Sequence, residues 1–208
     1  VRADDVELDD SGRPSFVLRT PRGDAPVRLA LVGGHQVANA LSAVAAALLV
    51  TDLPTVVARL EAARPVSRWR MEVSERPDGV TVVNDSYNAN PESMRAALKT
   101  LKVMGAGGHR RTVAVLGAMG ELGADSREAH MDLGRFVVRL DVGQLIVVGP
   151  AAGGIHAGAV LEGSWGSESL HVDDIDAAVA LLRAELLPGD VVLVKASRAA
   201  GLERVAAA

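Results

Sequence analysis

Residues 84–91 read NDSYNANP and follow the apolar run VTVV. Asp85 can accept hydrogen bonds from a ribose or from a metal-bound water. Asn88 and Asn90 can each donate and accept, which suits an adenine edge or an amide substrate. The structural alternative is turn formation, by Asp85 after the strand and by the two asparagines before Pro91. The residues alone leave both interpretations open for each of these side chains.

Two further segments carry side chains that suit an anionic ligand. Arg70 lies in RWRMEV, between two differently patterned parts of the chain, and a guanidinium can hold a phosphate by two parallel hydrogen bonds. His35 and Asn39 are four residues apart at the start of a helical pattern, so they share a face near a helix N-terminus, which favours anions. A solvated surface arginine and a turn-forming histidine are the alternatives.

The usual phosphate cradle is missing from this sequence. It contains no G-x-x-x-x-G-K-[ST] segment, and none of its lysines, Lys99, Lys102 and Lys195, follows a glycine. There is no cysteine, and the histidines do not show the spacing of metal ligands. We therefore expect no complete metal site within this chain and no P-loop lysine.

Composition favours a folded protein without general affinity for nucleic acid or membranes. Of 208 residues, 49% are hydrophobic and 23% are charged, which is enough to build a core. The formal net charge of −4 gives no general attraction to nucleic acid or anionic lipid. No apolar run approaches the roughly 20 residues of a membrane span, and no signal peptide is visible. We expect a cytoplasmic protein with no nucleic-acid partner and no membrane insertion.

Residues 1–66 are expected to form a small part in which strands precede helices. Strand-like runs occur at 15–20 and 27–32, and the segment PRGDAP between them contains two prolines and a glycine, which predicts a turn. Apolar residues at helical spacing then predict helices over 33–50 and 52–65.

From residue 67 onward, short apolar runs alternate with helical patterns. Such alternation predicts βαβ units and a Rossmann-like, mostly parallel sheet of the α/β class. The predicted strands lie at 69–76, 79–85, 111–119, 144–149 and 190–197, with helices at 91–104, 126–140 and 174–187. Polar or glycine-containing loops follow Val83, Leu116, Val148 and Val194. Because ligands bind at the carboxyl ends of parallel strands, we expect these loops to line one edge of the sheet.

Several segments match a known pattern in this order along the chain. They are GGHQVANALSAVAAAL at 33–48, SRWRMEV at 67–73, VVNDSYNANPESMRAAL at 82–98, AVLGAMGELG at 114–123, the pair His130 and Gly134, and VLVKASRAAGLE at 192–203. Together they resemble the Mur ligase family over nearly the whole chain. The asparagine-rich segment is similar to that of the member that joins D-alanyl-D-alanine to UDP-N-acetylmuramoyl-tripeptide. Ala118 departs from the aspartate that the family commonly has at this position.

The resemblance implies a domain organisation and a reaction. Residues 1–66 would be the C-terminal part of a central ATP-binding domain, and 67–208 a Rossmann-like C-terminal ligase domain. ATP and Mg²⁺ are the implied cofactors, with the P-loop and the metal-binding acid on upstream N-terminal and central domains. In the complete enzyme, ATP would convert the tripeptide carboxylate into an acyl phosphate. The amine of D-Ala-D-Ala would then attack it, as a step of peptidoglycan synthesis.

The resemblance also implies roles for the candidate residues. Arg70 would reach the transferring phosphate and act as the catalytic residue. The implied ATP-binding residues are His35, Asn39, Arg70, Asp85, Asn88, Asn90 and Pro91. The implied D-Ala-D-Ala-binding residues are Tyr87, Asn88, Asn90, Ser197 and Arg198. No metal ligand is implied on this chain.

A second hypothesis is a non-catalytic nucleotide- or peptide-binding module of the same fold. The missing phosphate cradle favours this second hypothesis for the chain in isolation. A G-[TK]-x-G-K-[ST] segment upstream of this chain would discriminate in favour of the ligase.

Overall fold

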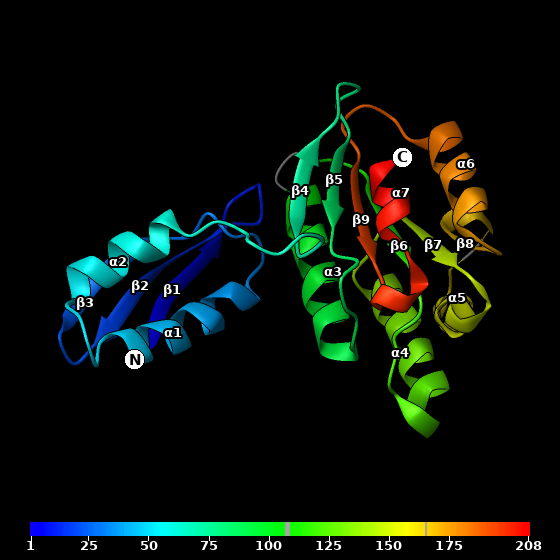
Figure 1. Cartoon of the computed structure of the whole chain (residues 1–208). Helices are drawn as coiled ribbons and strands as arrows, with labels where there is room; N and C mark the ends of the chain where they lie inside the picture. Colours follow the sequence, from blue (N-terminus) through cyan, green and yellow to red (C-terminus); the bar gives the residue numbers. More distant parts are fainter. Residues whose placement is uncertain (107–108, 165) are drawn as a thin grey trace. The chain divides into compact units, whose positions relative to one another are not determined.

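The computed structural model describes residues 1–106, 109–164 and 166–208 (Figure 1). By its internal contacts the chain divides into two compact units, Val1–Val66 and Ser67–Ala208. Each unit buries its own cluster of hydrophobic side chains. None of the helices in the described residues is both long and apolar enough to cross a membrane.

The first unit packs two helices against a three-stranded antiparallel sheet. Its elements are β1 (Arg2–Leu8), β2 (Pro14–Thr20), β3 (Gly23–Arg28), α1 (His35–Ala47) and α2 (Leu53–Ala62), with strand order β1-β2-β3. Leu18 and Val44 are fully buried at the centre of this core. The Asp52 carboxylate accepts a hydrogen bond from the Thr55 backbone N–H at 2.9 Å and so caps α2. The prediction of strands followed by two helices is therefore confirmed.

The boundaries predicted for β3 were wrong. PRGDAP, predicted as a turn, is mostly strand, because β3 begins at Gly23 and pairs in register with β2 from Thr20↔Gly23 onward. The strand predicted over 27–32 ends at Arg28. β3 is an edge strand, where a proline such as Pro26 does not remove a ladder hydrogen bond.

The second unit is built on a six-stranded sheet with the order β4-β5-β9-β6-β7-β8. Its strands are β4 (Glu72–Glu75), β5 (Thr81–Asn84), β6 (Thr112–Leu116), β7 (Gln144–Val148), β8 (Ser169–Val172) and β9 (Val191–Lys195). All neighbours pair in parallel except β4, which is antiparallel to β5. The predicted mostly parallel sheet is confirmed. Strand β8 was not predicted, because it is short and carries Ser169 and His171 among its apolar residues.

Helices cover both faces of this sheet (Figure 1). They are α3 (Pro91–Ala106), α4 (Ser126–Arg139), α5 (Gly153–Glu162), α6 (Ile175–Glu185) and α7 (Glu203–Ala207). Alternate strand residues such as Val115 and Val194 pack in one cluster with α6 and α7. The residues between them, such as Leu116 and Leu193, point the other way and are also buried, because α3, α4 and α5 pack on that side. Helix α5 was not predicted, since half of its residues are alanine or glycine, and α7 was not predicted, since it has only five residues.

The motif loops lie along one edge of the sheet, as predicted. Strands β5, β9, β6 and β7 are parallel, so their carboxyl ends point the same way. Two backbone hydrogen bonds continue the pairing of β6 and β9 beyond the strands, from Gly117 N–H to Lys195 O and from Ser197 N–H to Ala118 O. The loops after these two strands are therefore held against each other.

Helix α4 holds the loop after β6 through His130 and packs closely against α5. His130 is buried on α4, and its Nε2 accepts a hydrogen bond from the Met119 N–H at 2.9 Å. Its Nδ1 donates to the Ser126 carbonyl at 2.6 Å, which fixes the tautomer. The two helices approach through glycines: a Cβ on Gly158 would lie 2.0 Å from the Met131 carbonyl oxygen.

We expect Gly158→Ala to destabilise the protein although alanine is the better helix former. The clash with backbone on α4 should cost about 1–3 kcal/mol, which outweighs a propensity gain of about 1 kcal/mol. Urea unfolding measures the difference, with the exposed neighbouring substitution Ala157→Ser as the control. Increased stability of Gly158→Ala would contradict the close helix contact.

Candidate functional site

The carboxyl edge of the second unit is organised around a buried ion pair. Lys195 is the last residue of the central strand β9, and its side chain is only 2% exposed. Its Nζ donates to Asp85 Oδ2 at 2.5 Å and to the Asn88 carbonyl oxygen at 2.9 Å. The Asp85 side chain, 14% exposed, is reached by solvent at one side. The pair therefore fastens the loop after β5 to the end of β9.

Asp85 also anchors the turn that precedes β4. Its Oδ1 accepts a hydrogen bond from the Met71 backbone N–H at 3.0 Å. Trp69 and Met71 both have left-handed backbones, with φ of 61° and 48°, which non-glycine residues rarely adopt. The Trp69 carbonyl accepts from the Tyr87 N–H, and Glu72 Oε2 accepts from the Trp69 N–H. Arg70 is thus held between two strained residues, both fixed by hydrogen bonds.

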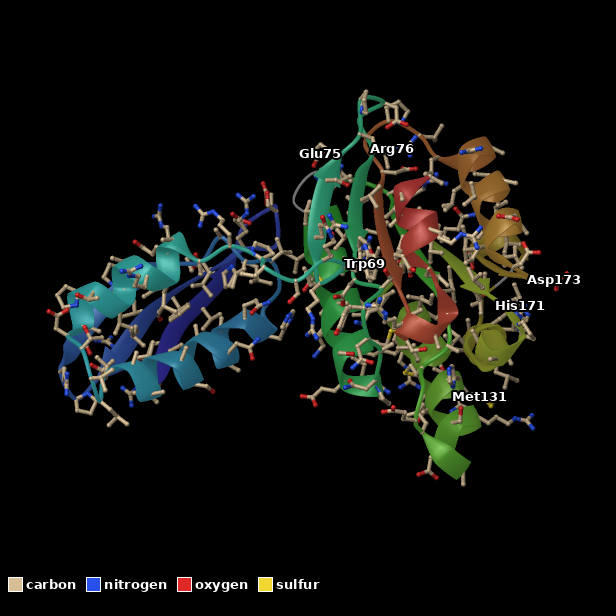
Figure 2. The ribbon with its side chains drawn as sticks, in the orientation of Figure 1. Trp69, Glu75, Arg76, Met131, His171 and Asp173 are labelled. Carbon is tan, nitrogen blue, oxygen red and sulfur yellow. The ribbon has the colours of Figure 1, made fainter. Side chains whose placement is uncertain are left out.

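Two arginines stack on aromatic rings at this edge. The Arg70 guanidinium lies 4.3 Å from the centre of the Tyr87 ring, and that of Arg198 lies 5.6 Å from the same ring. Arg198 also lies 5.1 Å from the ring of Trp69, which Figure 2 labels. Both arginines are exposed, and among the described residues neither has a carboxylate partner. The stacking orients two guanidinium groups whose donors remain free for an anion.

The asparagines of the loop contribute to its structure. Asn90 Oδ1 accepts from the Ser93 N–H at 2.8 Å, and Ser93 Oγ accepts from the Asn90 N–H at 3.1 Å, which caps α3 ahead of Pro91. Asn88 Oδ1 accepts from the Ala89 N–H, while its backbone carbonyl receives Lys195. Both asparagines are exposed, so a capping role leaves their Nδ2 groups accessible to a ligand.

Ser197 lies at the rim of an open cavity on the same edge. The cavity has a volume of about 460 Å³ and is also lined by Ala118, Gly149, Asp174 and Arg204. This volume is within the roughly 300–1,000 Å³ typical of small-molecule sites. The cavity therefore offers room for a small substrate beside the loop that carries Arg198.

In the first unit, His35 and Asn39 both contact Gln36. His35 Nε2 lies 3.2 Å from Gln36 Nε2, and Asn39 Nδ2 donates to Gln36 Oε1 at 3.0 Å. All three lie in the first turn and a half of α1, after the left-handed Gly33, whose φ is 109°. The predicted shared face is present, and it includes Gln36, which the sequence analysis did not single out.

His156 and His171 lie outside the network of Arg70, Asp85 and Lys195. His156 lies against Ser169, and burial lowers the pKa of its imidazole, with a further contribution from His171, whose ring centre is 6.0 Å away. Figure 2 shows His171 and Asp173 at the edge of the sheet formed by β8, whereas Trp69 precedes β4 at the opposite edge. In the part of the chain that the structure describes, no group of three or more histidine, aspartate or glutamate residues is placed to hold a metal ion.

The structure gathers the predicted residues of the second unit and adds two that were missed. Arg70, Asp85, Tyr87 and Arg198 lie within one network, and Ser197 continues it. The added residues are Lys195 and Trp69. The sequence did contain a signal for Lys195. This lysine directly follows the apolar run VVLV, and a lysine in a strand buried on both faces needs a partner.

We expect Asp85→Ala to lower the free energy of unfolding of this chain by about 3 kcal/mol or more. The substitution leaves the ammonium of Lys195 buried without its counter-ion. Asp132→Ala is the matched control, because Asp132 pairs with Arg135 at the surface of α4, where the side chains are 46% and 36% exposed. That pair should contribute less than about 1 kcal/mol. Equal losses for the two variants would show that the Asp85 pair is not structurally important.

Comparison with known proteins identifies the family. Residues 69–198 match the family described as "Mur ligase, glutamate ligase domain". The UDP-N-acetylmuramoyl-tripeptide–D-alanyl-D-alanine ligase of Mycobacterium bovis is 52% identical over 99% of this chain, which covers 44% of that protein. The chain therefore spans less than half the length of this relative.

Solved structures agree with this match. MurF from Acinetobacter baumannii superposes with a TM-score of 0.85 and 32% identity, over 99% of this chain and 43% of that one. MurF from Thermotoga maritima, solved in complex with ADP, superposes with a TM-score of 0.79 and 27% identity, over 98% of this chain and 44% of that one. The sheet order, the matched residues and these likenesses lead to one conclusion: the chain belongs to the Mur ligase family.

Proposed function

We propose that this chain is part of an ATP-dependent ligase that joins D-Ala-D-Ala to UDP-N-acetylmuramoyl-tripeptide in peptidoglycan synthesis. The geometric observation that carries the proposal is the pair of stacked, exposed guanidinium groups of Arg70 and Arg198, which suits an anionic phosphate. The 52% identity to a protein that bears the name of this ligase supports the choice of substrates.

The two units correspond to two functional parts in this proposal. Residues 1–66 are the end of a central ATP-binding domain, and residues 67–208 are the C-terminal ligase domain. His35 and Asn39, linked through Gln36, would contact the nucleotide from the first part. Exposed amide and imidazole groups at a helix N-terminus fit such a contact.

The second unit would act on the transferring phosphate and the nucleotide. When bound, ATP with Mg²⁺ supplies the phosphoryl group that activates a carboxylate for attack by an amine. Arg70 would bind phosphate oxygens and stabilise negative charge that develops there. Asp85 keeps free acceptor capacity, because each carboxylate oxygen can accept a second bond, so a ribose hydroxyl can be bound beside Lys195.

The incoming dipeptide would bind at the edge that carries Ser197 and Arg198. Arg198 suits its carboxylate, and the cavity at Ser197 has room for a dipeptide. Tyr87, Asn88 and Asn90 would border the same substrate, since their side chains are exposed on the neighbouring loop. An assay of the full-length protein with D-Ala-D-Ala, D-glutamate and diaminopimelate tests this choice. Activity with either of the other two in place of D-Ala-D-Ala would contradict it.

We expect this chain alone to release no phosphate from ATP. Phosphoryl transfer needs a phosphate-binding lysine and a metal-holding acid, and the sequence has no P-loop segment to supply the lysine. Phosphate release is measured against a blank without protein and against the full-length enzyme. Release that persists through repeated purification would contradict the expectation.

We expect Arg70→Lys in the full-length enzyme to lower kcat more than it raises the KM for ATP. Lysine keeps the charge but loses the two-pronged geometry and the stacking on Tyr87. Losing an interaction that is made mainly in the transition state lowers kcat, here by about tenfold to a hundredfold. Arg127→Lys, on the exposed face of α4, is the control. An unchanged kcat with a raised KM would make Arg70 an ordinary substrate-binding residue.

A further inference from the structure

We infer that Lys195 is a positioning residue of the site: its buried ammonium holds Asp85, and through Asp85 it sets the turn that presents Arg70. The inference rests on the proposed function for its catalytic consequence. Its structural part concerns this chain alone and can be tested without any assay of ligation.

The position of Lys195 is fixed by its strand and its burial. β9 is paired on both sides, with β5 and with β6, so its last residue cannot shift easily. A buried ammonium needs hydrogen-bond acceptors around it. Two of its donors reach Asp85 Oδ2 and the Asn88 carbonyl, which both belong to the loop after β5. Lys195 therefore fastens this loop to the sheet, together with the backbone hydrogen bond from the Asp85 N–H to the Val194 carbonyl.

Asp85 transmits that position to the Arg70 turn. Its second oxygen holds the N–H of Met71, which has a left-handed backbone and is the residue after Arg70. Strained residues persist only where surrounding bonds hold them. If the carboxylate swings away toward solvent, the N–H of Met71 loses its acceptor. The turn then keeps its hydrogen bonds at Trp69, to Tyr87 and Glu72, but is no longer held at Met71.

Lys195 also neutralises the charge of Asp85, the acidic residue that accepts from the neighbour of Arg70 in the chain. A carboxylate beside a guanidinium normally forms an ion pair with it. Here Asp85 pairs with Lys195 instead, and among the described residues Arg70 has no carboxylate partner. The guanidinium therefore remains available to a phosphate, although an acidic residue is bonded to its neighbour in the chain.

The first experiment measures the solvent exposure of Trp69, and so the opening of the turn, on this chain alone. Trp69 reports on the turn by its fluorescence once Trp165→Phe leaves it as the single tryptophan. Lys195→Met should raise acrylamide quenching of Trp69 about twofold, because the turn opens locally. Lys102→Met is the matched control, since it breaks an exposed lysine–aspartate pair, and it should leave quenching unchanged. Unchanged quenching in Lys195→Met, with only a lower Tm, would overturn the inference.

A double variant separates positioning from simple loss of a buried charge. Lys195→Met combined with Asp85→Asn removes both charges but keeps an amide oxygen to accept from the Met71 N–H. Its Trp69 quenching should return to within about 1.3-fold of the parent, because no uncompensated charge remains to pull the side chain outward. Quenching as high as in Lys195→Met would overturn the role of the charge pair. This variant also provides the test if Lys195→Met alone does not fold.

The catalytic consequence is tested in the full-length enzyme. Lys195→Met should lower kcat by about tenfold to a hundredfold, because Arg70 is no longer held in position. The KM for ATP should rise as well, because Asp85 loses the position in which it would accept a hydrogen bond from the ribose. In an Arg70→Lys background, Lys195→Met should lower kcat by less than about twofold, because both changes act through the guanidinium of Arg70. Fully additive losses would overturn the inference. If the full-length enzyme ligates nothing, the proposed function fails, while the quenching result still decides whether Lys195 sets the turn.

Discussion

The ammonium of Lys195 is buried at the end of the central strand, and a buried charge must be paired. Its partners are the Asp85 carboxylate and a carbonyl of the same loop, and Asp85 in turn anchors the Arg70 turn. The loop after β5, the strand β9 and the turn before β4 are therefore connected by one short chain of bonds. The geometry of the candidate site depends on these bonds, since Arg70 lies in the turn before β4 that they hold.

The sheet topology brings these groups together in the first place. Parallel neighbours β5, β9 and β6 end at the same edge, so loops that are far apart in sequence meet there. Glycines on α4 and α5 allow those helices to touch, and buried His130 on α4 fixes the loop after β6. Some of the candidate residues thus build this edge, and others have side chains that remain exposed on it.

Several residues of the asparagine-rich loop have structural roles that still leave their side chains accessible. Asn90 caps α3 and Asp85 holds the turn, yet Asn90 is exposed and Asp85 is partly accessible. Capping and ligand binding were opposed as alternatives for these residues in the sequence. They are compatible in the structure, because an amide or carboxylate has more hydrogen-bonding capacity than one cap requires. The charge balance supports the same view, since Asp85 is neutralised by Lys195, whereas Arg70 and Arg198 have no acidic partner within the part of the chain that the structure describes.

The sequence by itself determined the α/β class, the parallel sheet and the edge at which the motif loops lie, because alternating apolar runs and helical patterns carry that information locally. It also indicated the family, through motifs that are contiguous in the chain. It failed on the boundaries of β3, where strand pairing overrode the turn preference of proline and glycine, and on β8, α5 and α7, whose local signals are weak. Only the tertiary structure decided that Asp85 pairs with Lys195 and that Arg70 and Arg198 share the Tyr87 ring. Asp85 and Lys195 are 110 positions apart, and Arg198 is similarly far from Tyr87. The propensities of neighbouring residues do not specify which distant side chains a fold brings into contact.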